Sequence, residues 1–199
     1  MASETEITPT KDGLAIIRHE HQNIGRVLTV LEDEIAALSA AADADSSAAD
    51  GAPSFDHLFA VVHYIRVFPD VFHHTKEEHY LFQVLRNRHA DTVGALDELE
   101  RQHREGAMLI DALDRALQEC KRDFPNGLDE LRSAAATYVE MQRRHIGMEE
   151  RDILPLAEEV LTADERAALA TAFGENEDPL FGSTLESRMH ALFERITRY

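Results

Sequence analysis

The chain has one cysteine, no tryptophan and few basic residues relative to acidic ones. Cys120 is the only thiol among 199 residues, so an intrachain disulfide and a zinc site made of several thiolates are both excluded. Lysine and arginine number 20 against 38 acidic residues, giving a formal net charge of −18. Because an acidic surface repels nucleic acid and anionic membranes, neither is an expected partner.

Long hydrophobic runs are also missing. No apolar run reaches the roughly 18 residues that a membrane span needs, and residues 1–10 lack the basic segment followed by an apolar one that marks a leader peptide. We therefore expect a soluble cytoplasmic protein without membrane spans. The length fits one domain, and 44% hydrophobic against 29% charged residues is typical of a globular protein.

Apolar residues recur at steps of three and four in four long stretches, which predicts four amphipathic helices. These stretches span about 12–42, 54–88, 91–122 and 128–160. Ser54 and Asp91 are candidate caps of the second and third helices, and Pro69 is expected to kink the second. Residues 39–53 contain no large apolar side chain and predict a loose connection.

Helices of this length predict an all-α fold, an up-down-up-down four-helix bundle. We assign residues 1–161 to the bundle and residues 162–199 to a C-terminal helical extension packed on or beside it. Two capping boxes, Thr162–Glu165 and Ser183–Glu186, predict the two short helices of this extension.

Histidine and glutamate recur four residues apart on the second and fourth predicted helices, and single histidines lie on the apolar stripes of the first and third. A spacing of four places both side chains on one helix face, about a turn apart. Imidazole and carboxylate together suit iron, manganese or zinc. The candidate metal ligands are His21, His103, His145 and Glu149, together with either His73 and Glu77 or His74 and Glu78 on the second helix.

These candidate ligands are expected at one height in an up-down bundle. His21 precedes the end of its helix by about 21 residues, and His73 follows the start of the next by about 19, so at ~1.5 Å per residue both lie roughly 30 Å from the connection. Counted from the next turn, His103 lies at the same height as His73 and Glu77. Counted from the last turn, His145 lies at the same height as His103. Since four unrelated surface histidines would agree only by accident, the spacing predicts an interior metal site.

In combination and in this order, the motifs resemble the hemerythrin-like domains, also called HHE cation-binding domains. The resemblance covers about residues 12–160. It implies a non-heme diiron centre with two oxo- or hydroxo-bridged irons per chain, histidines as terminal ligands, and Glu77 and Glu149 as bridges. Members of this family are known for binding dioxygen, iron or nitric oxide and for sensing.

Two positions depart from the oxygen-carrying members of that family. Ala107 stands where hemerythrin proper has a second histidine on its third helix, which leaves one iron with a solvent ligand, another residue or nothing. Glu149 and Glu150 stand where those members use an aspartate five residues after the last histidine. Both departures favour sensing or redox chemistry over reversible oxygen carriage.

The second helix offers two registers, His73 with Glu77 or His74 with Glu78. Alignment of the glutamate pair with the family pattern favours the first, with the second pair flanking the site. Tyr138 lies two turns before His145 on the same face, and it is either a core tyrosine or a side chain that reaches a bound ligand.

Two functions agree with these features. The first is binding of dioxygen, nitric oxide or a related small ligand in sensing or in a response to oxidative or nitrosative stress. The alternative is a diiron enzyme that reduces peroxide or oxidises ferrous iron, for which the place left free at Ala107 is the supporting feature. A structural site with a single zinc or iron is a third hypothesis. A protein partner or a second copy of the chain also agrees with the sequence.

Overall fold

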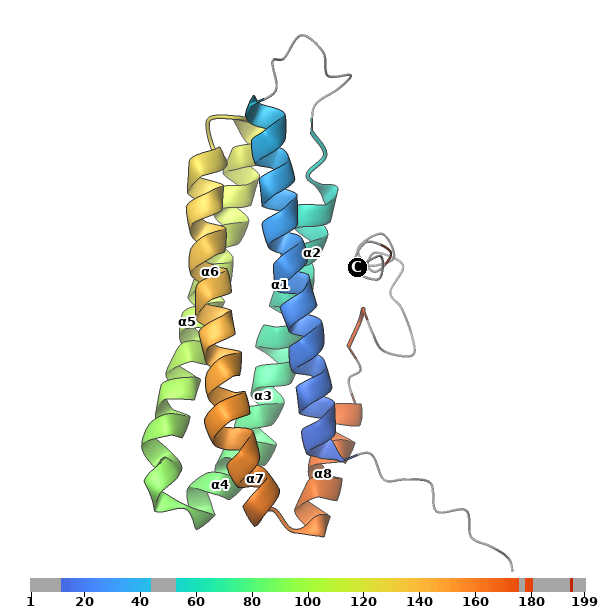
Figure 1. The fold of residues 1–199 in the computed structure, drawn as a ribbon, viewed down its shortest axis with the longest axis vertical. Helices are drawn as coiled ribbons and strands as arrows, with labels where there is room; N and C mark the ends of the chain where they lie inside the picture. Colours follow the sequence, from blue (N-terminus) through green and yellow to red (C-terminus); the bar gives the residue numbers. More distant parts are fainter. Residues whose placement is uncertain (1–11, 44–52, 176–177, 181–193, 195–199) are drawn as a thin grey trace, which may run out of the picture.

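The computed structural model describes residues 12–43, 53–175, 178–180 and 194. Four rods run side by side along the long axis, alternately up and down (Figure 1). The first rod is α1 (Gly13–Asp43) and the third is α5 (Val93–Arg122). The second rod contains α2 (Asp56–Val67), α3 (His74–Lys76) and α4 (Gln83–Arg88), and the fourth contains α6 (Leu128–Met148) and α7 (Leu154–Val160). The predicted all-α bundle is confirmed, and the described residues contain no strand.

Three π-helical segments join the pieces of the second and fourth rods. They are η1 (Phe68–His73), η2 (Glu77–Phe82) and η4 (Glu149–Ile153). A π turn holds one more residue than an α turn, and such segments occur frequently at functional sites. Pro69, which the sequence predicts to kink the helix, lies in the first turn of η1, where the helical pattern already changes.

The ends of the helices agree with the sequence only in part. The prediction that Asp91 caps the third helix is wrong, because Asp91 lies inside the 3₁₀ turn η3 (Ala90–Thr92) and no side chain caps α5. Ser54 is not the N-cap residue of α2, because Phe55 occupies that position. The Ser54 hydroxyl nevertheless accepts a hydrogen bond from the Asp56 N–H at 3.3 Å. The capping box at Thr162 is confirmed at the start of α8 (Ala163–Gly174). The predicted box at Ser183 and its helix lie outside the described residues.

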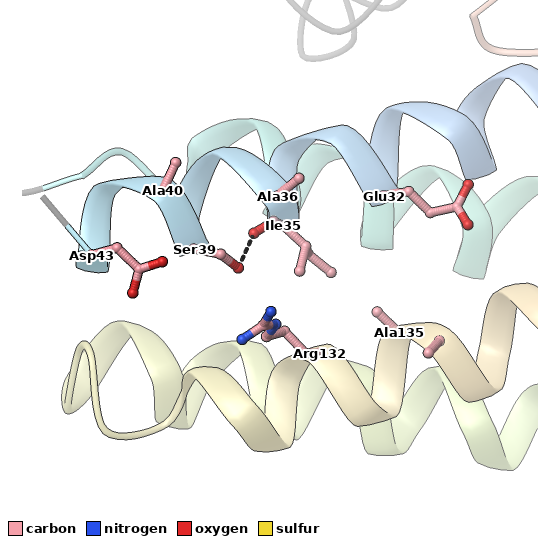
Figure 2. Close-up of a pocket in the computed structure, with 9 residues that line it drawn as sticks. Glu32, Ile35, Ala36, Ser39, Ala40, Asp43, Arg132 and Ala135 are labelled. Carbon is pink, nitrogen blue, oxygen red and sulfur yellow. Dashed lines mark hydrogen bonds between the residues drawn. The ribbon is translucent and has the colours of Figure 1, made fainter.

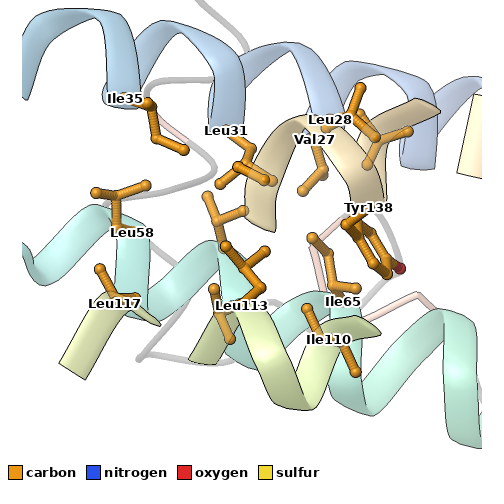
Figure 3. Close-up of a cluster of buried hydrophobic side chains, with 14 of the residues drawn as sticks. Val27, Leu28, Leu31, Ile35, Leu58, Ile65, Ile110, Leu113, Leu117 and Tyr138 are labelled. Atoms are coloured by element: carbon orange, nitrogen blue, oxygen red, sulfur yellow. The ribbon is translucent and has the colours of Figure 1, made fainter. Parts of the chain in front are cut away.

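Buried apolar side chains form two separate clusters, one above the other in the bundle. The upper core holds α1 from Ile24 to Leu38 together with residues of α2, α5 and α6 (Figure 3). The lower core holds Leu14 and Ile17 together with residues of η2, α4, α5, α7 and α8. This division leaves a level between the clusters for polar side chains.

Helix α8 packs beside the start of α1. A Cβ atom at Gly13 would lie 2.7 Å from Leu169 Cβ, so the two helices approach closely because position 13 has no side chain. Lys76 Nζ donates to the carbonyl of Phe173 at 3.4 Å, which ties the end of α8 to the second rod.

The division of the chain at residue 161 stays a prediction. No helix within the described ranges has the length and apolar character to cross a membrane.

Candidate metal centre

The polar level between the two cores contains all six predicted ligands. On α1, His21 lies between Ile17 of the lower core and Ile24 of the upper core. On α5, His103 lies between Leu99 and Ile110 in the same way. All six side chains are between 0% and 7% exposed. The four rods therefore bring these histidines and glutamates together at one height in the interior.

The histidine Nε2 atoms point toward two central carboxylates. His73 Nε2 lies 3.2 Å from Glu77 Oε1, and His21 Nε2 lies 3.5 Å from the same oxygen. His21 Nε2 also lies 3.2 Å from Glu149 Oε2, and His145 Nε2 lies 3.4 Å from that oxygen. The remaining ring, His103, has its Nε2 3.8 Å from Glu77 Oε2. Glu77 and Glu149 are thus shared neighbours of several imidazoles.

The ligand atoms fall into overlapping sets in which every atom lies within 4.8 Å of the others. One set combines His21 and His73 with the two glutamates. The others combine His103 and His145 with the two glutamates, or with His74. Because Glu77 and Glu149 belong to both sides, the arrangement can hold two cations with a pair of carboxylates between them.

The donor atoms themselves support this interpretation. Nine of them are buried and have no hydrogen-bond partner within the described ranges: Nε2 of His21, His73, His74, His103 and His145, and both carboxylate oxygens of Glu77 and Glu149. Burying carboxylates and imidazoles without hydrogen-bond partners costs free energy, and bound metal would offset that cost by taking these atoms as ligands. The residues present therefore fit metal ligation by nitrogen and oxygen.

Four of the five imidazoles are held by a side chain on the opposite ring nitrogen. The Nδ1 contacts are His21 with Glu150 at 2.8 Å, His73 with Glu20 at 2.7 Å, His103 with Glu78 at 2.7 Å and His145 with Gln102 at 3.2 Å. The fifth, His74, has Nδ1 3.8 Å from Asp70 Oδ1. Such partners fix the ring orientation and make Nδ1 the protonated nitrogen, which leaves Nε2 free for a metal.

The carboxylates divide the imidazoles into two electrostatic groups. Burial would lower the pKa of His73, but the carboxylates of Glu77 and Glu20 outweigh it and raise the pKa to about 9. Burial is outweighed in the same way at His21, whose pKa is raised by neighbouring glutamates. Burial and the adjacent imidazoles instead lower the pKa of His74. In the metal-free protein, protons on His21 and His73 therefore compete with a cation for the site.

His74 is the residue that the predicted ligand set lacks. The sequence offers the pairs at 73/77 and 74/78 as alternatives, but the structure buries both histidines and only Glu77 of the two glutamates. The His74 ring stacks on His103 with centroids 4.1 Å apart, whereas Ala107, which stands where hemerythrin proper has a second histidine, is exposed. Glu78 is half exposed and accepts from His103 Nδ1 instead. The two adjacent histidines at 73 and 74 are the signal that could have identified His74.

The other described histidines lie away from this cluster. They are His19, His57, His63, His79 and His89, and none belongs to a group of potential metal ligands in the described structure. His190 lies outside the described residues. A surface groove between α1 and α6, lined by residues such as Glu32, Ala36 and Arg132, is also remote (Figure 2). Glu32 follows His21 by eleven positions on α1, roughly 16 Å along the helix.

Comparison with known proteins decides the family. The family model of the hemerythrin HHE cation binding domain matches residues 12–157. The chain belongs to the hemerythrin HHE cation-binding family. No curated protein and no solved structure gives a significant match. The matched range contains every candidate ligand.

The HHE domain name agrees with the chemistry of the interior. The clustered imidazoles and carboxylates fit a metal-binding protein, as the family description states. Helix α8 lies beyond the matched residues, yet the ring of Phe173 packs edge-on against His73 with centroids 5.9 Å apart. One wall of the metal centre is therefore supplied by a segment that follows the HHE domain.

Proposed function

We propose that this protein is a non-heme diiron protein that binds dioxygen, nitric oxide or a related small ligand, in sensing or in a response to oxidative or nitrosative stress. The observation that carries the proposal is the convergence of five imidazole nitrogens and two carboxylates at one buried level, all of them without hydrogen-bond partners among the described residues. Mixed nitrogen and oxygen ligation of two adjacent cations favours iron and oxygen chemistry.

The two sides of the centre are unequal. His74, His103 and His145 face one cation position, and His21 and His73 face the other, with Glu77 and Glu149 between them. The first position thus has three imidazoles and the second has two. The two glutamates group with His103 and His145 on one side and with His21 and His73 on the other. For iron, which commonly takes six ligands, the two-histidine position has more room for an exogenous ligand.

When bound, an iron pair supplies the redox-active centre that takes up the ligand. The side chains of this chain supply the rest. Glu20 and Glu150 hold the imidazoles of His73 and His21 through Nδ1, so that Nε2 is presented to the cation. The apolar cores above and below exclude bulk water, which strengthens the charge interactions within the site. These features favour stable binding of a small molecule in a dry interior.

The structure lends less support to the enzyme alternative than the sequence does. Peroxide reduction or ferrous oxidation was favoured by the coordination place left free at Ala107. Ala107 is exposed, whereas the buried His74 stacks on His103 and offers a third imidazole beside His103 and His145. With fewer free places at the three-histidine position, we favour ligand binding over turnover.

Elemental analysis and an optical spectrum of the aerobically purified protein test the metal assignment. We expect two irons per chain and the charge-transfer absorption of a bridged diferric pair. One zinc or one iron per chain would refute the diiron proposal and favour the single-metal reading.

Stopped-flow mixing separates the two functions. Reduced protein mixed with dioxygen or nitric oxide is expected to form a stable adduct that is lost when the gas is removed. Rapid consumption of peroxide over many turnovers would instead favour the enzyme. A protein partner, a second copy of the chain and the cytoplasmic location stay predictions.

A further inference from the structure

Three buried polar atoms next to the metal centre are not part of the proposed ligand set. The Tyr138 hydroxyl and the Gln142 side-chain N–H₂ group have no hydrogen-bond partner within the described ranges, and neither does Asp70 Oδ1. Tyr138 is 0% exposed and Gln142 is 1% exposed. Because an unpaired buried donor is unfavourable, two such donors near one another indicate that they bond to a molecule bound beside them.

The two donors lie on the buried face of α6 and precede the candidate ligand His145 along that helix. Tyr138 and Gln142 are four residues apart, so their side chains lie on one face a turn apart, and Gln142 precedes His145 by three positions. Figure 3 shows the Tyr138 ring beside Ile65 and Ile110, with its hydroxyl oxygen directed away from Leu117. Along the bundle this is the direction of the metal centre.

Asp70 lies in η1 of the second rod and contributes a third polar group to the same region. Burial and, after it, the charge of Asp70 raise the pKa of Tyr138. Asp70 Oδ1 also lies 3.8 Å from His74 Nδ1. An acceptor oxygen, a phenol hydroxyl and an amide thus lie buried beside the apolar upper core, without hydrogen-bond partners in the described part of the chain.

We propose that the Tyr138 hydroxyl and the Gln142 amide, here named the donor pair, donate hydrogen bonds to the small ligand held at the metal centre and to a water molecule in its absence. The proposal rests on the proposed function and specifies the ligand class, a small molecule with a lone pair on its outer atom. Azide is the probe because it is small, binds ferric iron and carries such a lone pair.

The test uses two variants and a matched control. Tyr138→Phe removes only the hydroxyl, and Gln142→Met replaces the amide by an apolar group of similar length. The control is Tyr64→Phe, because Tyr64 is also 0% exposed but its hydroxyl already donates to Asp178 at 3.1 Å. In an optical titration of the iron-loaded protein, each donor-pair variant should weaken azide binding by about two- to tenfold, the value of one hydrogen bond.

The azide titration can fail in two distinguishable ways. If Tyr138→Phe and Gln142→Met bind azide as tightly as the unaltered protein, the donor pair does not contact the ligand and the proposal is overturned. The same holds if Tyr64→Phe weakens azide as much as they do. If the unaltered protein holds two irons but gives no azide band at all, the proposed ligand-binding function is refuted.

A readout that does not use iron tests the donor pair separately. Thermal unfolding of the zinc-loaded protein should show a lower midpoint for Tyr138→Phe, in the same direction as for Tyr64→Phe, because each loses a hydrogen bond. A hydroxyl that bonds to nothing would behave in the opposite way, since its removal would leave the midpoint unchanged or raise it. That result would overturn the proposal whatever the azide titration shows.

Discussion

Replacing His74 by alanine probes the part of the metal centre that the tertiary structure adds to the sequence. His74 is 4% exposed, stacks on His103 at 4.1 Å and meets His145 edge-on at 5.1 Å. His74→Ala takes one of three imidazoles from the three-histidine position, leaving two imidazoles and the shared glutamates. We expect the metal content to fall from two per chain toward one.

The effect on stability should depend on whether metal is bound. Removing a large buried side chain costs about 2–5 kcal/mol, and 1 kcal/mol shifts the melting temperature of a domain of this size by about 2–4 °C. The metal-loaded variant should therefore melt about 4–20 °C below the unaltered protein. In the metal-free protein, His74 Nε2 is a buried atom without a hydrogen-bond partner, and its removal relieves a cost of about 1–3 kcal/mol. The loss there should be smaller.

Calorimetry on loaded and metal-free samples, together with elemental analysis, measures both quantities. His79→Ala is the matched control, because His79 is exposed and only bonds to the carbonyl of Thr75 at 2.7 Å. If His74→Ala keeps two metals and melts like the His79 variant, then His74 is not a ligand. The third imidazole would then have to be assigned elsewhere.

Three further predictions follow from the same structure. Stripping the metals removes the cations beside the buried carboxylates of Glu77 and Glu149, and protons on His21 and His73 replace those cations only in part, so the melting temperature should fall by about 6–20 °C. An unchanged curve after verified metal loss would count against an interior site. Glu78→Ala releases His103 Nδ1 and should weaken metal affinity about 10- to 100-fold in a chelator competition, with equal affinity as the contrary result. Gly127→Ala would place a Cβ atom 2.6 Å from Cys120 Cα and should lower the free energy of unfolding in urea by about 1–3 kcal/mol. The Cβ atom of Gly147→Ala would meet nothing within 4 Å, so this substitution should raise the free energy of unfolding by up to about 1 kcal/mol. Equal shifts for the two glycines would contradict the packing at residue 127.

The level of the metal centre could be predicted from the sequence because α-helices have a fixed rise. Once the turns are located, residue counts give heights, and His21 and His103 meet the second rod at the level that the counts require. The apolar stripes predicted the helices for a similar reason, because only apolar residues at helical spacing form one continuous buried face on a helix. Errors at the helix starts, such as Asp91, arose because several polar residues there are equally suitable caps.

The partners of the imidazoles depend on contacts between rods, which residue spacing does not specify. Glu20 precedes His21 in the chain, yet it holds His73 on another rod. Gln102 precedes His103 and holds His145. Each pairing follows from the rotation of one rod against its neighbour, a quantity set by side-chain packing in both cores.

By itself, the sequence determined the helical class, the bundle and the shared height of the candidate histidines and glutamates, because helix rise and hydrophobic period are local properties of the chain. Only the tertiary structure decided that both His73 and His74 face the interior. Adjacent residues on a regular α-helix point about 100° apart and compete for one face. The π turns of η1 and η2 change the helical phase around His73 and His74, and the surrounding rods then give each ring its own side of the site.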